Sequence, residues 1–329
     1  MPLKPHPPFV LPDPALFART RLGVVGNLNR DLKTSPLRAG SHLFEDGETT
    51  VAAIHETVGG GAANSACSAA ALGARVAFLG KVGADALGER LEAVLRRQGI
   101  ATHLVHDATV ATGTTVNLNY ASGQRHFISA LPNNAALRVE ELDLGVLKGC
   151  DHLLRADVWF SEALLFGGNA VLFAAAQAAG TAISLDLNWD PQWGVASAAV
   201  VQERKAAVRA LLPLVTLAHG NVRELCAFTD APDLRSALGL LEAWGVEAVV
   251  VHLGAEGAGY YSQGQLAVAE PAPLEHIVQS TGSGDVLSVC MMLLHTQTQL
   301  TMLERLHLAN GIVAAFMAGQ CQFIPALAG

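Results

Sequence analysis

The segment Gln279-Ser280-Thr281-Gly282-Ser283-Gly284-Asp285 runs directly into an apolar stretch, Val286 to Leu294, whose composition predicts a buried helix. A Gly-x-Gly sequence at a helix start leaves backbone N–H groups free to bind an anion, and the helix dipole adds to the attraction. Asp285 falls in the first turn, beside that anion. Because like charges repel, a carboxylate there suits a general base that deprotonates a hydroxyl attacking a phosphoryl group. The alternative is a Gly/Ser loop followed by a helix-stabilising acid.

Two other polar segments also lie next to expected strands or helices. Gly59-Gly60-Gly61-Ala62-Ala63-Asn64 precedes a helix of small residues, so a ligand could approach its backbone closely and meet the amide of Asn64. Gly26-Asn27-Leu28-Asn29-Arg30-Asp31 leaves the end of an apolar run, and at strand spacing Asn27, Asn29 and Asp31 point to one side. Such a polar row suits sugar hydroxyls at the edge of an open α/β sheet. The alternative for the first segment is a simple turn before an Ala-rich helix. The alternative for the second is a polar loop after a strand.

Strands and helices alternate along most of the chain, which implies a mostly parallel sheet covered by helices on both faces. We expect strands at 22–26, 75–79, 182–187, 214–218 and 248–253. We expect helices at 62–72, from Asp85, at 197–212, from Asn221 and from Asp233.

Two stretches, 41–58 and 101–129, alternate with period 2 instead, and Asp46-Gly47 and Ser122-Gly123 are typical of hairpin tips. They predict a small β-sheet lid, built from insertions at about 32–58 and 101–129. In the strand 115–120 the apolar face (Val116, Leu118, Tyr120) opposes a polar face (Thr115, Asn117, Asn119). Residues 1–20 are Pro-rich and are expected to form an extended arm before the main domain at 21–329.

Composition excludes several classes of protein. The 329 residues exceed the size of one simple core, 51% are hydrophobic and 15% charged, so a compact globule is expected rather than a disordered chain. The net charge of −8, without a basic run, argues against nucleic acid as a partner. No apolar run long enough for a membrane span or a signal peptide is present, so we expect a cytoplasmic protein.

Common catalytic and metal motifs are absent from the sequence. Five well-separated cysteines form no Cys-x-x-Cys pair, so neither a disulfide framework nor a zinc site is predicted. The chain has no Gly-x-x-x-x-Gly-Lys-Ser/Thr and no Gly-x-Ser-x-Gly, and Gly282-Ser283-Gly284 lacks the third glycine of a dinucleotide site. P-loop, hydrolase and Rossmann dehydrogenase functions are therefore excluded.

The two glycine motifs, in this order and roughly 220 residues apart, resemble those of the ribokinase-like (PfkB) carbohydrate kinases. The resemblance runs from about Leu22 to Gln320. It implies a three-layer α/β/α sandwich with a mostly parallel central sheet and a small β-sheet lid. It also implies ATP-dependent phosphoryl transfer to a sugar hydroxyl, with Mg²⁺.

Carried over by position, the resemblance assigns a role to each matching residue. Asp285 matches the catalytic base, and Gly282, Ser283 and Gly284 match the anion hole for the transferred phosphoryl. The sugar site corresponds to Asn29, Asp31, Gly60, Gly61 and Asn64. The pair Asn221 and Glu224 resembles the motif that orders Mg²⁺ and its waters. The nucleotide side corresponds to Asn188, Asn221, His252, Gly254, Gly257, Thr281 and Asn310. Asp186-Leu187-Asn188, with Trp193, resembles the segment between the two sites.

Four positions depart from the family pattern. Gln279 replaces the usual Asp or Asn, so the resemblance does not decide whether a monovalent-cation site is present. His252 stands where Thr is common in the nucleotide turn. Asp190 occupies a place where some members carry Arg, and Cys290 replaces a small residue.

Three readings of function remain. The leading one is a kinase for a hydroxyl, preferentially a primary CH₂OH, of a neutral pentose, ketohexose or nucleoside. An acidic or phosphorylated acceptor needs paired cations, and the sugar-side segments offer only Arg30, Lys33, Arg38 and Arg125. A non-catalytic sugar- or nucleotide-binding protein is the third. The apolar face of strand 115–120 also predicts a homodimer formed through the lid.

Overall fold

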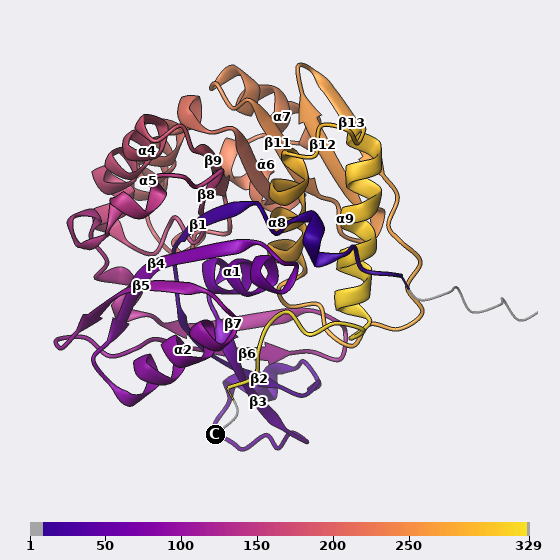
Figure 1. Ribbon diagram of the computed structural model, residues 1–329. Helices are drawn as coiled ribbons and strands as arrows, with labels where there is room; N and C mark the ends of the chain where they lie inside the picture. The colour runs from indigo at the N-terminus through magenta and orange to yellow at the C-terminus, as the bar shows by residue number, and fades with distance from the viewer. Residues whose placement is uncertain (1–8, 328–329) are drawn as a thin grey trace, which may run out of the picture.

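The computed structural model describes residues 9–327 and contains two sheets (Figure 1). Within these residues, nine strands form the large sheet, in the order β13-β12-β11-β10-β9-β8-β1-β4-β5, and four form a small sheet, β3-β2-β6-β7. The strands from β11 to β5 are parallel, and β12 and β13 continue the sheet antiparallel. This is the mostly parallel sheet that the alternation of elements predicted.

The large sheet comprises β1 (Arg21–Val25), β4 (Arg75–Gly83), β5 (Ala101–Asp107), β8 (His152–Arg155), β9 (Ala182–Asp186), β10 (Leu217–Asn221), β11 (Ala248–His252), β12 (Ala258–Ser262) and β13 (Gln265–Ala269). The small sheet comprises β2 (Asn29–Thr34), β3 (Ile54–Gly59), β6 (Thr114–Asn119) and β7 (Arg125–Ala130). The main helices are α1 (Gly61–Ala71), α2 (Ala86–Arg97), α4 (Asn169–Ala178), α5 (Ala198–Arg209), α6 (Val222–Thr229), α7 (Leu234–Ala243), α8 (Ser283–His295) and α9 (Met302–Met317). A short helix, α3 (Pro132–Ala135), follows the small sheet.

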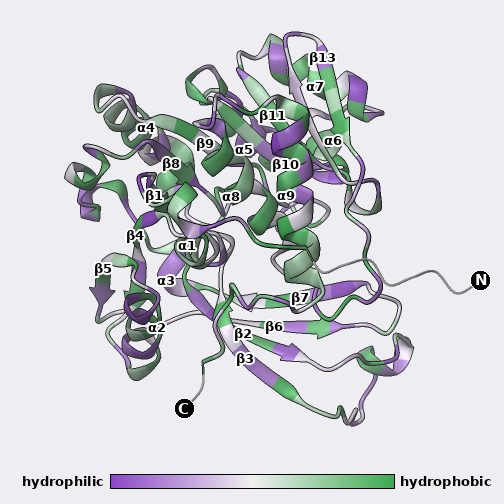
Figure 2. Cartoon of the chain, turned by 45° about the vertical axis from the view of Figure 1, so that its right-hand side comes forward, coloured by the Kyte–Doolittle hydropathy of each residue, from purple (hydrophilic) through white to green (hydrophobic). Residues whose placement is uncertain are grey.

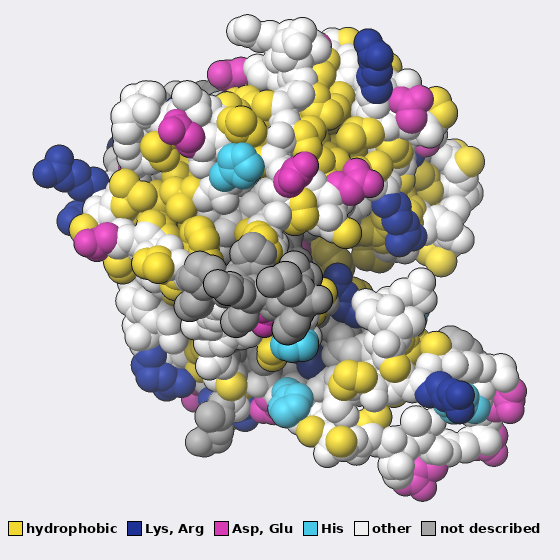
Figure 3. Space-filling view, turned by 90° about the vertical axis from the view of Figure 1, so that its right-hand side faces the viewer, with side chains coloured by type: hydrophobic (Ala, Val, Ile, Leu, Met, Phe, Trp, Pro, Cys, Tyr) yellow, Lys and Arg dark blue, Asp and Glu magenta, His cyan; other side chains and the backbone are white. Residues whose placement is uncertain are grey.

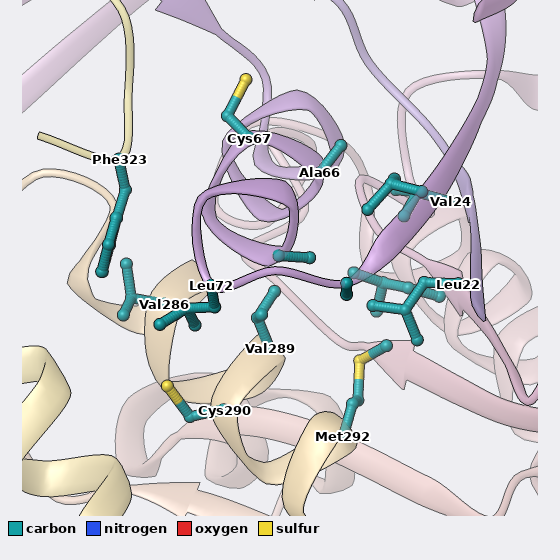
Figure 4. Close-up of a cluster of buried hydrophobic side chains, with 14 of the residues drawn as sticks. Leu22, Val24, Ala66, Cys67, Leu72, Val286, Val289, Cys290, Met292 and Phe323 are labelled. Carbon is teal, nitrogen blue, oxygen red and sulfur yellow. The ribbon is translucent and has the colours of Figure 1, made fainter. Parts of the chain in front are cut away.

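Helices cover both faces of the large sheet because successive side chains of each strand point to opposite faces. On one face, β1 presents Leu22 and Val24 to a core that it shares with α1, α2, α8 and α9. Figure 4 shows part of this core, with Ala66 of α1 on the side of Val24, and with Val286 and Val289 of α8 on the side of Leu72, just after α1. On the other face, Val25 joins a second core with α4 to α7. Cys290, one of the departures, is fully buried in the first core.

Three boundary predictions were wrong. Residues 101–107 were assigned to the lid, but they form β5 at the edge of the large sheet, paired in parallel with β4. An edge strand with one solvated face alternates just as a lid strand does, so periodicity could not separate the two. Asp46-Gly47 is not a hairpin tip, since it lies in the long connection 35–53 between β2 and β3. The strand predicted at 214–218 begins instead at Leu217, after a 3₁₀ turn at Leu212–Leu214.

The start of the chain is less extended than expected. Residues 1–8 of the predicted arm lie outside the described residues. Pro14–Leu16 form a 3₁₀ turn, and Phe17 is fully buried in the first core. Phe9 packs so closely on α9 that a Cβ at Gly311 would lie 2.1 Å from its ring. In the described part of the chain, no helix combines the length and apolarity needed to cross a membrane.

Candidate active site

The candidate site lies where the carboxyl ends of the parallel strands face the small sheet. The chain passes from β1 directly into β2, and from β3 directly into α1, so two short connections join the small sheet to the main body. Figure 2 shows the small sheet below the main body, with α1 above it. In the space-filling view, a notch separates the two parts, and a Lys or Arg side chain is visible in it (Figure 3).

The glycine-rich loop ends at the first turn of α8, as predicted. Gly282 has a φ of 88°, and a Cβ there would lie 2.5 Å from the side chain of Ile324, so both backbone and space require glycine. Gly284 packs against His252, whose Nδ1 would lie 3.1 Å from an added Cβ. Ser283 is the first residue of α8. The loop therefore presents backbone at a helix N-terminus, where an anion is favoured.

Asp285 lies beside this loop and contacts the other glycine motif. Asn64 Nδ2 donates to Asp285 Oδ2 at 2.9 Å, across 221 residues of sequence. Burial raises the pKa of Asp285 to about 8; the Asn64 hydrogen bond opposes this, and the carboxylates of Asp157, Glu224 and Asp31 add to it. In the ligand-free protein at neutral pH the carboxyl group is therefore largely protonated. A cation arriving with substrate would favour the ionised form that a general base requires.

The sugar-site residues predicted from the first segments come together at the start of the small sheet. Asn29 Nδ2 donates to Asp31 Oδ1 at 2.9 Å, and burial raises the pKa of Asp31 to about 6, against the opposing effect of Lys33. A Cβ at Gly59 would lie 1.9 Å from Asp31 Oδ1, so the backbone of the glycine segment touches this carboxyl. Asn27 is buried in the turn between β1 and β2.

Asp157 is a buried residue that sequence reasoning missed. Its carboxylate accepts hydrogen bonds from the backbone N–H groups of Asn27, Gly61 and Ala62 at 3.1, 3.2 and 2.9 Å. It thereby ties the β1–β2 turn to the start of α1. Burial raises its pKa and those three bonds oppose the shift. Asp157 could have been found from its position just after β8, at the carboxyl edge of the large sheet, but this short strand was not predicted.

The inner face of the small sheet closes the site from the other side. Thr281, just before the loop glycines, accepts hydrogen bonds from Asn117 Nδ2 of β6 at 3.4 Å and from Arg125 Nη1 of β7 at 3.1 Å. Three buried side-chain oxygens around the site have no partner within the described residues: Asn64 Oδ1, Asn117 Oδ1 and Thr57 Oγ1. Unpaired buried oxygens are costly, and substrate hydroxyl groups would satisfy them.

On the predicted nucleotide side, Asn221 and Glu224 form a reciprocal cap at the start of α6. Glu224 N donates to Asn221 Oδ1 at 2.9 Å, and Asn221 N donates to Glu224 Oε2 at 2.8 Å. Burial raises the pKa of Glu224, and it raises that of buried Asp186 well above its usual range, with added repulsion from Glu224 and Asp285. The capping contacts use one oxygen of each side chain, so a carboxylate oxygen of Glu224 remains for another ligand.

The other predicted nucleotide residues lie in separate segments. Gly254 and Gly257 bound the turn between β11 and β12, as predicted. Asn310 Nδ2 donates to the carbonyls of Ala269 and Glu270 at 3.0 and 2.8 Å, so it fixes α9 to the end of β13. Asn188 Oδ1 accepts from the backbone N–H of Asp157 at 2.8 Å.

The departures from the expected pattern have structural partners. Gln279 Nε2 donates to the carbonyl of Phe316 at 3.0 Å, and His252 Nε2 lies 3.2 Å from Ser288 Oγ. Asp190 is fully buried and pairs with Arg204 at 2.7 Å. Trp193 packs against Trp159 and Trp189 in the second core.

The acids at the sheet edge suit Mg²⁺ better than a metal held by protein alone. Within residues 9–327 no group of three His, Cys, Asp or Glu side chains could hold a metal ion. Mg²⁺ commonly keeps several waters and uses one or two carboxylates together with substrate phosphates. The pKa of Asp186 is raised first by burial and then by the neighbouring carboxylates of Glu224 and Asp285, and burial raises the pKa of Glu224. A divalent cation would favour the ionised form of both acids.

Comparisons with known proteins agree with this arrangement. The profile of the pfkB family carbohydrate kinases matches residues 19–293. A fructokinase of Vibrio alginolyticus is 27% identical over 247 residues, 74% of this chain and 77% of that protein. A 1-phosphofructokinase of Xanthomonas campestris is 32% identical over 267 residues, 77% of this chain and 79% of that protein. The crystal structure of a putative ribokinase II from E. coli superposes with a TM-score of 0.77 at 21% identity, covering 91% of this chain and 93% of that one, and so shares the fold.

Proposed function

This chain belongs to the pfkB family of carbohydrate kinases, and from that premise we propose that it transfers the terminal phosphoryl group of ATP to a primary hydroxyl of a small sugar or nucleoside. One observation carries the proposal. Asp285, in the first turn behind the glycine loop, is hydrogen-bonded to Asn64 on the helix that follows the other glycine motif. The predicted base thus lies where the predicted anion site and the predicted sugar site meet.

In this proposal Asp285 takes the proton of the acceptor hydroxyl as the oxygen attacks the phosphoryl group. Asn64 holds the carboxyl group in position, since its Nδ2 already donates to Oδ2. The backbone of Gly282, Ser283 and Gly284 receives the phosphoryl oxygens at the start of α8. Asn29 and Asp31 bind acceptor hydroxyls beside the backbone of Gly60 and Gly61.

ATP would lie along the nucleotide segments already described, between the β11–β12 turn and α9, with Asn188, His252 and Thr281 toward its phosphates. The acids Asp186 and Glu224, with Asn221, would hold Mg²⁺ through its waters, and the ion would neutralise phosphate charge. Gln279 Nε2 donates to the carbonyl of Phe316, which leaves Oε1 as the atom of that side chain that could bind a monovalent cation.

The small sheet would exclude water from the reaction. Its contacts with Thr281 place it directly over the glycine loop, and water at that point would otherwise compete with the acceptor for the phosphoryl group. We also propose a cytoplasmic location, since ATP is abundant there and the five cysteines are free, as in a reducing compartment.

Neutral pentoses, ketohexoses and nucleosides are our first candidates for the acceptor, because the residues beside Asp285 are hydrogen-bonding amides and a carboxyl group. By name, the relatives include both a fructokinase and a 1-phosphofructokinase, so acceptors with and without a phosphate occur among them. A non-catalytic binding protein is the second candidate, and its support is the presence of His252 and Gln279 at positions where the family usually has other residues.

The test is ADP release from ATP and Mg²⁺ with single acceptors from four classes: neutral sugars, nucleosides, sugar phosphates and sugar acids. We expect release that depends on one class of acceptor and far exceeds the rate with ATP alone. Calorimetric binding of ATP or sugar without ADP release for any acceptor would favour the binding protein and overturn the kinase.

A further inference from the structure

Lys33 lies on the inner face of the small sheet without a polar partner. It is half-buried, and within the described residues it makes no hydrogen bond or ion pair. Every other described lysine or arginine that is not exposed has an acid or an acceptor oxygen as partner: Arg30, Lys81, Arg155, Arg204, Lys205 and Arg305. An ammonium group that loses part of its water without gaining a partner is less favourable than an exposed one, so a partner is expected to arrive with a ligand.

The charges around Lys33 place it between the two parts of the site. Burial lowers its pKa, while Asp31 and Asp285 oppose that shift and Arg125 adds to it. Lys33 therefore feels the predicted sugar-site acid, the predicted base and the second cation of the small sheet. No described carboxylate comes within ion-pair distance of it, so these charges act on it from further away.

Arg125 extends the same positive region to the glycine loop. It belongs to β7, and its Nη1 donates to Thr281 Oγ1 at 3.1 Å. Lys33 is the register partner of Asn117 on β6, which contacts the same Thr281 hydroxyl. The two cations therefore flank a point on the small sheet that touches the loop just before Gly282. Arg125 is exposed along much of its length and forms no ion pair with a described acid.

We propose that Lys33 and Arg125 form the cationic half of a phosphate-binding subsite, which is complete only while the small sheet contacts the glycine loop. This inference rests on the proposed kinase function and deepens it. The phosphate has two possible sources, the terminal phosphoryl group of ATP or a phosphate carried by the acceptor. A neutral acceptor on its own needs neither cation, because Asn29, Asp31 and Asn64 already offer hydrogen-bond partners to hydroxyl groups.

The variants Lys33→Met and Arg125→Gln test the subsite, and Lys33→Arg and Arg125→Lys retain the charge. The matched control is Lys148→Met, because Lys148 is exposed and precedes β8, at the amino ends of the strands of the large sheet. Calorimetry measures the binding of Mg²⁺ complexes of ADP and of a non-hydrolysable ATP analogue. Steady-state kinetics compares neutral and phosphorylated acceptors.

Loss of a charge-assisted hydrogen bond predicts about a tenfold or larger effect. If the terminal phosphoryl group is the anion, the ATP analogue binds at least about tenfold more weakly to the neutral variants, ADP binding is unchanged, and kcat falls with every acceptor. If the acceptor carries the anion, nucleotide binding is unchanged and KM rises only for phosphorylated acceptors. In both cases the charge-retaining variants recover most of the loss.

Affinities and KM values within twofold of wild type in all arms, with only a change in melting temperature, would show that Lys33 merely balances Asp31 and Asp285 and would overturn the proposal. The binding arms need no turnover. A protein that phosphorylates nothing, yet loses affinity for the ATP analogue in Lys33→Met, would therefore keep the subsite while the kinase function failed.

Discussion

At the scale of single residues, the site is a group of carboxyl groups held close together with few cations. The pKa values of Asp31, Asp157, Asp186 and Asp285 are all raised, and in each case burial is the first cause. Such acids destabilise the ligand-free fold when they ionise. The arrangement is useful only if the ligand brings positive charge or if one of the acids must accept a proton.

This predicts that the ligand-free protein becomes less stable as the pH rises. Between about pH 4 and pH 8 the folded protein keeps a proton on Asp285 that the unfolded chain has released, since its pKa rises from 3.8 to about 8. Raising the pH across that range therefore lowers the free energy of unfolding, and Asp31 contributes in the lower part of it, up to about pH 6. The measurement is urea unfolding from pH 5 to 9 in wild type and in Asp285→Asn, which cannot ionise. The variant should show a flatter dependence, and parallel curves would refute the shifted pKa.

Asp31→Ala should weaken acceptor binding and leave ATP binding intact. Each charge-assisted hydrogen bond to a sugar hydroxyl is worth roughly 1.5–3 kcal/mol, so KM for the acceptor should rise about tenfold or more. Asp46→Ala, in the exposed connection between β2 and β3, is the matched control. An unchanged acceptor KM in Asp31→Ala would place the sugar site elsewhere.

Sequence reasoning found the residues of the site that lie in recognisable motifs, and missed those whose role depends on contacts between distant segments. Asn64, Asp31 and Asp285 were found because glycines or strand spacing mark their segments. Asp157 was missed because its three N–H partners come from distant segments of the chain, and no local sequence pattern predicts such contacts. The missing partner of Lys33 likewise follows only from the folded structure.

At the scale of elements, the junction between β3 and α1 has the least room. Gly60 has a φ of 98°, and a Cβ there would lie 2.3 Å from the carbonyl oxygen of Asn27. Gly99, after α2, has a φ of 78° with nothing within 4 Å of an added Cβ. Both glycines have a positive φ, but Gly60, with a ψ of 132°, also lies outside the left-handed helical region, and only Gly60 has a clash.

Gly60→Ala should accordingly destabilise the protein more than Gly99→Ala. A positive φ costs an L-residue roughly 1–2 kcal/mol, which both variants should lose at least. The ψ of 132° and the clash with Asn27 should add to the loss only at Gly60. Chemical unfolding of both variants measures the difference. Equal losses would mean that the β1–β2 turn moves away without cost.

The pattern of elements along the chain predicted most of the large sheet, because helices and buried strands have distinct periods. The prediction failed for β5, because an edge strand of the large sheet and a lid strand have the same period of hydrophobic residues. It also failed for β8, because this strand is too short to show a period. The 3₁₀ turn at Leu212–Leu214, with Pro213, displaced the start of β10 because an apolar run continues through it.

At the scale of the whole molecule, part of the outer face of the small sheet is exposed. Ile54 and Ile128 are 60% and 56% exposed there, and Val116 and Leu118 of β6 lie between their strands on the same face. An exposed apolar sheet face is commonly covered by a partner, and we propose a homodimer formed through this face.

The dimer predicts a mass of about twice 34.3 kDa by light scattering at micromolar concentration. Ile128→Lys, on the edge strand β7 of this face, should shift the mass to that of a monomer, whereas Val200→Lys on α5, also exposed, should not. A monomeric mass for the wild type at these concentrations would contradict the proposed interface.

The proposed phosphoryl transfer depends on Asp285 as its base, and Asp285→Asn tests this role most directly. Asparagine keeps the size and can still contact Asn64, but it takes up no proton at neutral pH. With the best acceptor, kcat should fall by about 10²–10⁴-fold, the usual contribution of general-base catalysis, while nucleotide affinity is maintained and the stability at neutral pH does not fall, because the variant has no proton to lose on unfolding. Turnover within threefold of wild type, accompanied only by a small loss of stability, would leave Asp285 as a helix-stabilising acid and contradict the account.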